Sequence, residues 1–183
     1  MAAILVLHAT VDGQAARIAE RIAQVLARGG HEVEMLPVQA RAALAALATS
    51  EAVVVGGSIR YGRYPRGLLQ FVRENRDALD ARPNAFFSVC LSAGGPGANP
   101  AAAWGYVEKF ISDGGWQPGR IASFAGALLY TRYNPFIRLL MRLIVGMAGG
   151  ETDTSRDYEY TDWEAVERFA AELDLQLRPA RAA

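Results

Sequence analysis

The chain has 183 residues, 51% of them hydrophobic, and its 19 Lys and Arg residues balance its 19 Asp and Glu residues. This length suits one domain with a buried core, and the lack of a basic excess argues against a nucleic-acid partner. A single cysteine excludes an intrachain disulfide, and the two histidines lack metal-ligand spacing, so no metal site is expected.

Short apolar runs alternate with segments of helical periodicity, which is typical of a parallel sheet covered by helices on both faces. The runs predict strands at 3–7, 32–36, 52–56, 84–91 and 121–129, and the periodic segments predict helices at 13–28, 40–48, 65–79, 100–113 and 161–177. The last helix starts with a capping box at Thr161-Asp162-Trp163-Glu164. We therefore expect an α/β, doubly wound, five-stranded parallel sheet of order 2-1-3-4-5, with a ligand site beside strands one and three, where the order reverses.

An insert at about 130–160 separates the fifth strand from the last helix and is much longer than an ordinary connection. It contains an apolar helix at 135–148 and no acidic residue between Gly126 and Gly150. We predict one domain over 1–177 that includes this insert, and a flexible tail at 178–183. No segment has the roughly 20 apolar residues of a membrane span, and the N-terminus lacks the basic start of a signal peptide. A cytoplasmic location is expected.

The loop after the first strand leads directly into a helix. It comprises Thr10, Val11, Asp12, Gly13, Gln14 and Ala15. The N–H groups and dipole at a helix N-terminus favour an anion such as phosphate. The alternative is an ordinary helix cap provided by Asp12 or Thr10. Neither a GxGxxG nor a GKS/T motif is present, so neither a Rossmann dinucleotide site nor a P-loop is indicated.

Two further loops follow the third and fourth strands. The first contains Ser58, Ile59, Arg60, Tyr61 and Gly62, and the second contains Ser88, Val89, Cys90, Leu91, Ser92, Ala93 and Gly94. Glycines allow the backbone to approach a flat ligand, on which Tyr61 or Tyr64 could stack, although both rings could instead fold back onto the domain. We expect Cys90 to be a small buried residue and His8 a core or supporting one. A phosphate site flanked by two such walls suits a mononucleotide with a planar ring, such as FMN.

Several motifs occur in one order from about Ile4 to Phe169. They include Asp12-Gly13-Gln14, Ser58-Ile59-Arg60-Tyr61-Gly62, Gly149-Gly150-Glu151-Thr152-Asp153-Thr154 and Tyr160-Thr161-Asp162-Trp163-Glu164. With these motifs the chain resembles the flavodoxin-like, menaquinone-dependent protoporphyrinogen IX oxidases (dehydrogenases) of bacterial haem biosynthesis. The resemblance implies a flavodoxin-like fold and FMN, with its phosphate on 10–15 and its ring between 58–62 and 88–94. It also implies oxidation of protoporphyrinogen IX to protoporphyrin IX in three two-electron steps, with menaquinone or another respiratory quinone as acceptor.

The phosphate loop departs from the family pattern at two positions. Residues usually found as Ser or Thr are Ala9 and Ala15 in this chain. Each lost hydroxyl removes about 0.5–1.5 kcal/mol of binding, less than the backbone supplies. We therefore expect weak retention of FMN rather than loss of function.

The apolar insert helix is open to three interpretations. Its cationic residues, with one just before it, are Arg132, Arg138 and Arg142. Residues 134–148 could lie in a membrane surface with the arginines on anionic headgroups, or the arginines could bind the propionates of the porphyrinogen. In the third interpretation the helix covers the domain and its arginines pair with Glu151 or Asp153. We favour membrane or substrate contact, and so a peripheral location on the cytoplasmic face of the inner membrane.

Other functions are compatible with the same residues. One is a flavodoxin-like NAD(P)H:quinone reductase or electron shuttle, although shuttles tend to be strongly acidic and this chain is neutral. Another is a flavin-free binding module with a relaxed phosphate loop. Because the flavin would carry the redox chemistry, no catalytic side chain is assigned, and protons could leave through Tyr61, Ser92 or water.

Overall fold

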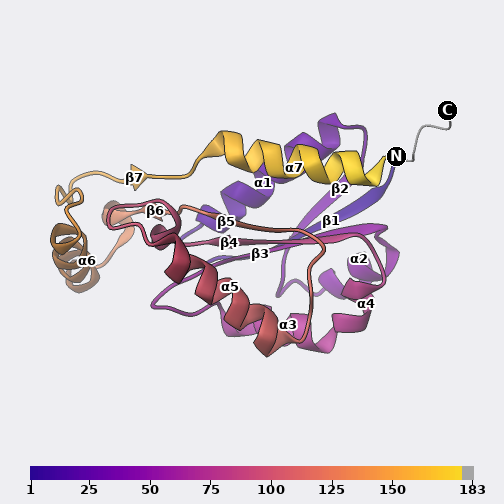
Figure 1. The fold of residues 1–183 in the computed structure, drawn as a ribbon, viewed down its shortest axis with the longest axis horizontal. Coiled ribbons are helices and arrows are strands. Elements are labelled where there is room, and N and C mark those ends of the chain that lie inside the picture. The colour runs from indigo at the N-terminus through magenta and orange to yellow at the C-terminus, as the bar shows by residue number, and fades with distance from the viewer. Residues whose placement is uncertain (179–183) are drawn as a thin grey trace.

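A computed structural model describes residues 1–178 and contains a five-stranded parallel sheet between two layers of helices (Figure 1). The strands are β1 (Ala3–Ala9), β2 (Glu32–Pro37), β3 (Ala52–Ser58), β4 (Asn84–Val89) and β5 (Ile121–Phe124). Their order, β2-β1-β3-β4-β5, and their parallel pairing confirm the predicted fold class.

Both faces of the sheet are buried, which explains why its strands are continuous apolar runs. On one face, Ile4 and Val6 pack with α1 (Gln14–Arg28) and α7 (Trp163–Leu177). On the other, Leu5 and Leu7 join a core that includes residues of four further helices. These are α2 (Ala43–Thr49), α3 (Arg66–Glu74), α4 (Arg76–Asp80) and α5 (Pro100–Gly114).

The fifth strand is shorter than predicted. It ends at Phe124, which pairs with Val89, the last residue of β4. Beyond this point β4 gives way to a 3₁₀ turn, η1 (Leu91–Ala93), so the edge strand loses its only neighbour. The rest of the apolar run forms β6 (Ala127–Leu128), which pairs antiparallel with β7 (Tyr158–Glu159), a strand that the sequence did not predict.

Two helix predictions also need correction. The helix expected at 65–79 divides into α3 and α4 at Asn75, whose side-chain amide donates to the carbonyl of Phe71 and so caps α3. At the start of α7, the cap is Asp162, which accepts from the N–H of Ala165. Thr161 instead donates its hydroxyl to the Ala125 carbonyl.

The insert after β6 begins with a second 3₁₀ turn, η2 (Tyr130–Arg132), and continues as helix α6 (Pro135–Met147). Figure 1 shows α6 beyond the carboxyl ends of the strands, at the far left, outside both helical layers. Within residues 1–178, no helix is long and apolar enough to span a membrane. Most of the predicted flexible tail, 179–183, lies outside the described residues.

Candidate functional site

A cavity of about 200 Å³ lies where the carboxyl ends of β1, β3 and β4 meet. All three predicted loops contribute to its walls, with Thr10, Asp12, Gln14, Ser58, Ile59, Arg60, Tyr61, Gly62, Val89, Cys90, Leu91 and Ser92. The loops converge because the three strands are neighbours in the sheet and all run in the same direction. The geometry therefore brings together the three segments on which the ligand hypothesis depends.

Six predicted residues do not line this cavity, namely Val11, Gly13, Ala15, Ser88, Ala93 and Gly94. Ala15 lies in the first turn of α1 and its side chain is fully buried in the core. Ser88 is also fully buried, and its hydroxyl accepts a 2.8 Å hydrogen bond from Tyr64. The Tyr64 ring packs 4.7 Å from that of Phe110, centroid to centroid, so it folds into the domain and is not available to stack on a ligand.

The first loop is shaped by its own backbone. Gly13 has φ of 95° in the left-handed region and occupies the N-cap position of α1, with no side-chain cap. Its N–H donates to the Thr10 hydroxyl at 2.9 Å, and the Asp12 carboxylate pairs with Arg60 at 3.2 Å. Neither Thr10 nor Asp12 caps the helix, so the capping alternative is wrong. The first-turn N–H groups of α1 have no partners within the helix.

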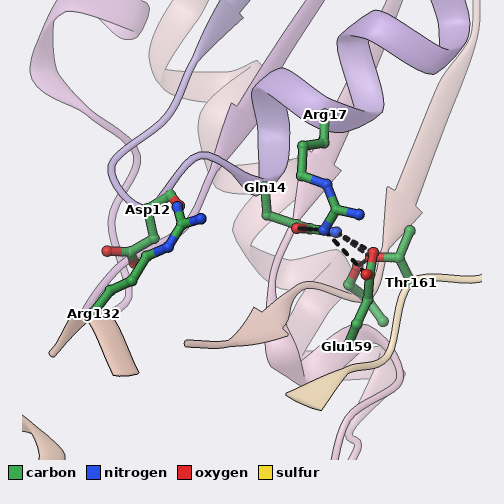
Figure 2. Close-up of polar contacts among 7 residues, drawn as sticks. Asp12, Gln14, Arg17, Arg132, Glu159 and Thr161 are labelled. Atoms are coloured by element: carbon green, nitrogen blue, oxygen red, sulfur yellow. Dashed lines mark hydrogen bonds and ion pairs between the residues drawn. The ribbon is translucent and has the colours of Figure 1, made fainter. Parts of the chain in front are cut away.

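A polar network holds the start of α1 against the end of the insert, as Figure 2 shows. The buried Gln14 amide donates 2.8 Å hydrogen bonds to Glu159 and Thr161. Arg17 donates to both Gln14 and Glu159 at 3.0 Å. The Gln14 side chain thus fixes the first loop against the end of the insert. The sequence carries no signal for this contact, because Gln14 and Glu159 are 145 residues apart.

The second loop contains a strained two-residue turn. Arg60 and Arg63 exchange backbone hydrogen bonds around Tyr61 and Gly62, which have φ values of 51° and 73°. A side chain in this left-handed conformation costs about 1–2 kcal/mol. The turn leaves the Tyr61 ring 65% exposed at the cavity, with the Arg60 guanidinium 5.3 Å from the ring centroid. Such strain is concentrated at functional sites.

The third wall carries the single cysteine. Cys90 is buried, and desolvation raises the pKa of its thiol, so the neutral form is favoured and the expectation of a buried, non-nucleophilic residue holds. His8 is buried as well, and burial lowers its pKa. Its ring does not line the cavity, in keeping with a core or supporting role.

The insert supplies a fourth wall that the sequence analysis missed. Tyr133, Ile137 and Met141 line the cavity, and Val145, one turn further along α6, is buried. Their spacing of four residues marks one face of a helix, and this periodicity is the signal by which they could have been found. The remaining wall residues that were not predicted are Tyr106, Gly126 and Ala127.

The three arginines assigned to substrate or membrane contact lie in different places. Arg138 donates to the carbonyls of Tyr130 and Tyr133, at 3.0 and 3.2 Å. Arg132 donates to the carbonyl of Asp12 at 3.3 Å, beside the first loop, and Arg142 is exposed.

The pairing with Glu151 or Asp153 that the third interpretation proposed for these arginines does not occur among the described residues. The Asp153 carboxylate accepts from Ser155 and pairs with Arg156 at 3.4 Å. The Glu151 carboxylate accepts from the Tyr160 hydroxyl, and this bond lowers the pKa of Glu151.

Comparison with known proteins places these features in a family. Residues 5–155 match the flavodoxin domain family. The chain is 39% identical to protoporphyrinogen IX dehydrogenase [quinone] of Escherichia coli (strain K12), over 92% of this chain and 93% of that protein. It is 40% identical to the protein of the same name from Leishmania major, over 92% of this chain and 73% of that one.

Solved flavodoxins share the fold at much lower identity. Oxidised flavodoxin 1 from Bacillus cereus superimposes with a TM-score of 0.56 at 18% identity, covering 96% of this chain and 99% of that one. A point mutant of flavodoxin from Pseudomonas aeruginosa gives 0.58 at 20% identity, covering 97% and 99%. With the sheet order, the converging loops and the match along almost the whole chain, this protein belongs to the flavodoxin domain family and, within it, to the protoporphyrinogen IX dehydrogenase [quinone] family.

Proposed function

We propose that this protein binds FMN and oxidises protoporphyrinogen IX to protoporphyrin IX, in haem biosynthesis, with a respiratory quinone such as menaquinone as electron acceptor. The observation that carries the proposal is the convergence of the loops after β1, β3 and β4 on one cavity, in a chain similar along most of its length to quinone-dependent dehydrogenases of this substrate. Fold alone would not support a particular reaction.

The residues present fit the cofactor. The first loop offers unpaired N–H groups at the start of α1 for a phosphate, and the exposed Tyr61 ring offers a stacking surface for a flat ring. The hydroxyl of Ser58 is buried, lines the cavity and has no hydrogen-bond partner among the described residues. A buried polar group without a partner is costly, and a bound polar ring would supply that partner.

The reaction asks for positioning rather than covalent catalysis by the protein. When bound, FMN supplies the two-electron redox chemistry. Ile137 and Met141 on one wall and Leu91 on another present apolar side chains that would exclude water from around a bound ring. Burial also raises the pKa of Tyr133, which therefore keeps its proton at the cavity edge. Backbone N–H groups at the ends of the strands can stabilise negative charge that develops on a reduced ring.

Helix α6 has one face on the cavity and an opposite face that is apolar and exposed. Its inner face lines the cavity, while its other face exposes large apolar side chains, namely Phe136, Leu139, Leu140, Leu143, Ile144 and Met147. Arg142 is also exposed on this helix, where it could meet anionic headgroups. Arg138 is instead bound to backbone carbonyls and is less available. We infer that this face of α6 rests on the cytoplasmic surface of the membrane, so that a lipid-dissolved quinone arrives close to the cavity.

An anaerobic assay with purified protein tests the reaction. Protoporphyrinogen IX, menaquinone and protein reconstituted with FMN are mixed, and the appearance of porphyrin is followed by its fluorescence. We expect turnover that requires all three components. Matched reactions omit FMN, omit the quinone, or replace the porphyrinogen with NADPH.

Each control answers a specific alternative. Quinone reduction with NADPH but none with protoporphyrinogen would replace the proposal with a quinone reductase. Failure to take up FMN, seen as the absence of a yellow protein after reconstitution, would favour a flavin-free binding module.

A further inference from the structure

The alanines at the two ends of the first loop offer no side-chain hydrogen bond to a phosphate. Ala9 and Ala15 are both almost completely buried in the hydrophobic core and carry no hydroxyl. The remaining hydroxyl, on Thr10, accepts a hydrogen bond from the N–H of Gly13. That hydroxyl keeps its own O–H as a donor, so a phosphate on this loop would depend on it, on backbone N–H groups and on nearby charge.

Within residues 1–178, one guanidinium at this loop has no acidic partner. Arg132 comes from η2, 120 residues away in sequence, and its Nη1 lies 3.3 Å from the Asp12 carbonyl. The same nitrogen is 3.6 Å from the point that a Cβ on Gly13 would occupy. Among the described residues the Arg132 side chain makes only this one hydrogen bond and no ion pair, so most of its guanidinium donors are free. Figure 2 shows Arg132 beside Asp12, across the start of α1 from Arg17.

The local charges leave a net positive site. The Asp12 carboxylate is already paired with Arg60 at 3.2 Å, which offsets its repulsion of an anion. The positive end of the α1 dipole and Arg132 then act on the same point. Guanidinium groups bind phosphate oxygens through two parallel hydrogen bonds, which is a stronger interaction than the hydroxyls would provide.

We infer that Arg132 binds the phosphate of FMN and is the residue that makes the site select the mononucleotide over riboflavin. This inference rests on the proposed function, because it requires that FMN is the cofactor. It assigns Arg132 to the cofactor rather than to the porphyrinogen or the membrane.

Titration of the apoprotein with FMN and, separately, with riboflavin tests the assignment, because the two ligands differ only in the phosphate. We expect Arg132→Gln to raise the Kd for FMN about tenfold or more, as for loss of a charge-assisted hydrogen bond, and to change the Kd for riboflavin by less than about twofold. Arg132→Lys keeps the charge but not the forked geometry and should fall between the wild type and Arg132→Gln.

Arg28→Gln is the matched control, since it removes the same charge from an exposed position at the opposite end of α1. It should leave both constants within about twofold of the wild type. An unchanged Kd for FMN in Arg132→Gln, an equal loss for FMN and riboflavin, or an equal effect of Arg28→Gln would each overturn the assignment. A wild type that binds neither ligand would refute the proposed function itself, and the inference with it.

Discussion

Replacing two leucines on the outer face of α6 should release the protein from membranes without affecting the cavity. Leu139 and Leu143 are 56% and 58% exposed and lie one turn apart, on the face that does not line the cavity. Burying a whole leucine is worth about 1.5–3 kcal/mol, so each contributes about 1–1.5 kcal/mol if its exposed part enters lipid. The double variant Leu139→Gln, Leu143→Gln loses about 2–3 kcal/mol in total and should therefore bind vesicles about 30-fold to 140-fold more weakly.

Flotation with vesicles that contain anionic phospholipid measures this change as a partition coefficient. Deleting the helix would be a poorer experiment, because it would also remove the cavity wall formed by Ile137 and Met141. Leu175→Gln is the matched control, since Leu175 is 66% exposed but lies on α7. The double variant should keep its turnover with a water-soluble quinone. Wild-type partitioning by the double variant, or an equal loss in Leu175→Gln, would refute the membrane role of this face.

Three further perturbations probe the fold and the site. Gly56→Ala should destabilise the protein by about 1–3 kcal/mol in urea unfolding, because the new Cβ would lie 1.9 Å from a phenyl ring of β4. The open helical position Gly105 should instead gain up to about 1 kcal/mol on substitution by Ala, and a loss at both sites would contradict this reasoning.

Asp174 has its pKa lowered, mainly by Arg178, so its ion pairing stabilises the fold above the unfolded pKa of about 3.9 and is lost as the pH falls through the folded pKa. Asp174→Asn should therefore lower the free energy of unfolding by about 1–2 kcal/mol at pH 7. In thermal melts at acid pH the stabilities of wild type and variant should converge. A stability difference that does not change with pH would exclude ion pairing as its cause. Ala9 lies in the hydrophobic core and not on the cavity, so Ala9→Ser should cost about 1–3 kcal/mol in urea unfolding and leave the Kd for FMN within about twofold. A clearly tighter Kd would show that this position reaches the phosphate after all.

Much of the fold could be predicted because its determinants are local. Continuous apolar runs such as 52–56 identify strands buried on both faces, and helical periodicity identifies the segments between them. Where a segment depends on a distant partner, the prediction was wrong. The fifth strand stops at Phe124 because β4 ends beside it, and the freed residues pair with β7 instead.

The functional site likewise combines features that could be predicted from local sequence with features that depend on distant contacts. Loops that follow adjacent parallel strands must meet at one edge of the sheet, so the strand pattern was enough to predict that the residues after β1, β3 and β4 would surround one cavity. Which side chains turn inward depended on packing. Tyr61 is exposed at the cavity because of a strained turn, whereas Tyr64, three residues later, is partly buried and packs against Phe110.

The way in which the insert completes the site depends on contacts between distant parts of the chain. The contact of Arg132 with Asp12 and that of Gln14 with Glu159 each join residues more than 100 positions apart. The orientation of α6, with Ile137 and Met141 on the cavity and Leu143 outside, likewise follows from how the insert folds back over the strand ends. No local pattern of residues specifies such contacts, because their free energy exists only once the chain has brought both partners together.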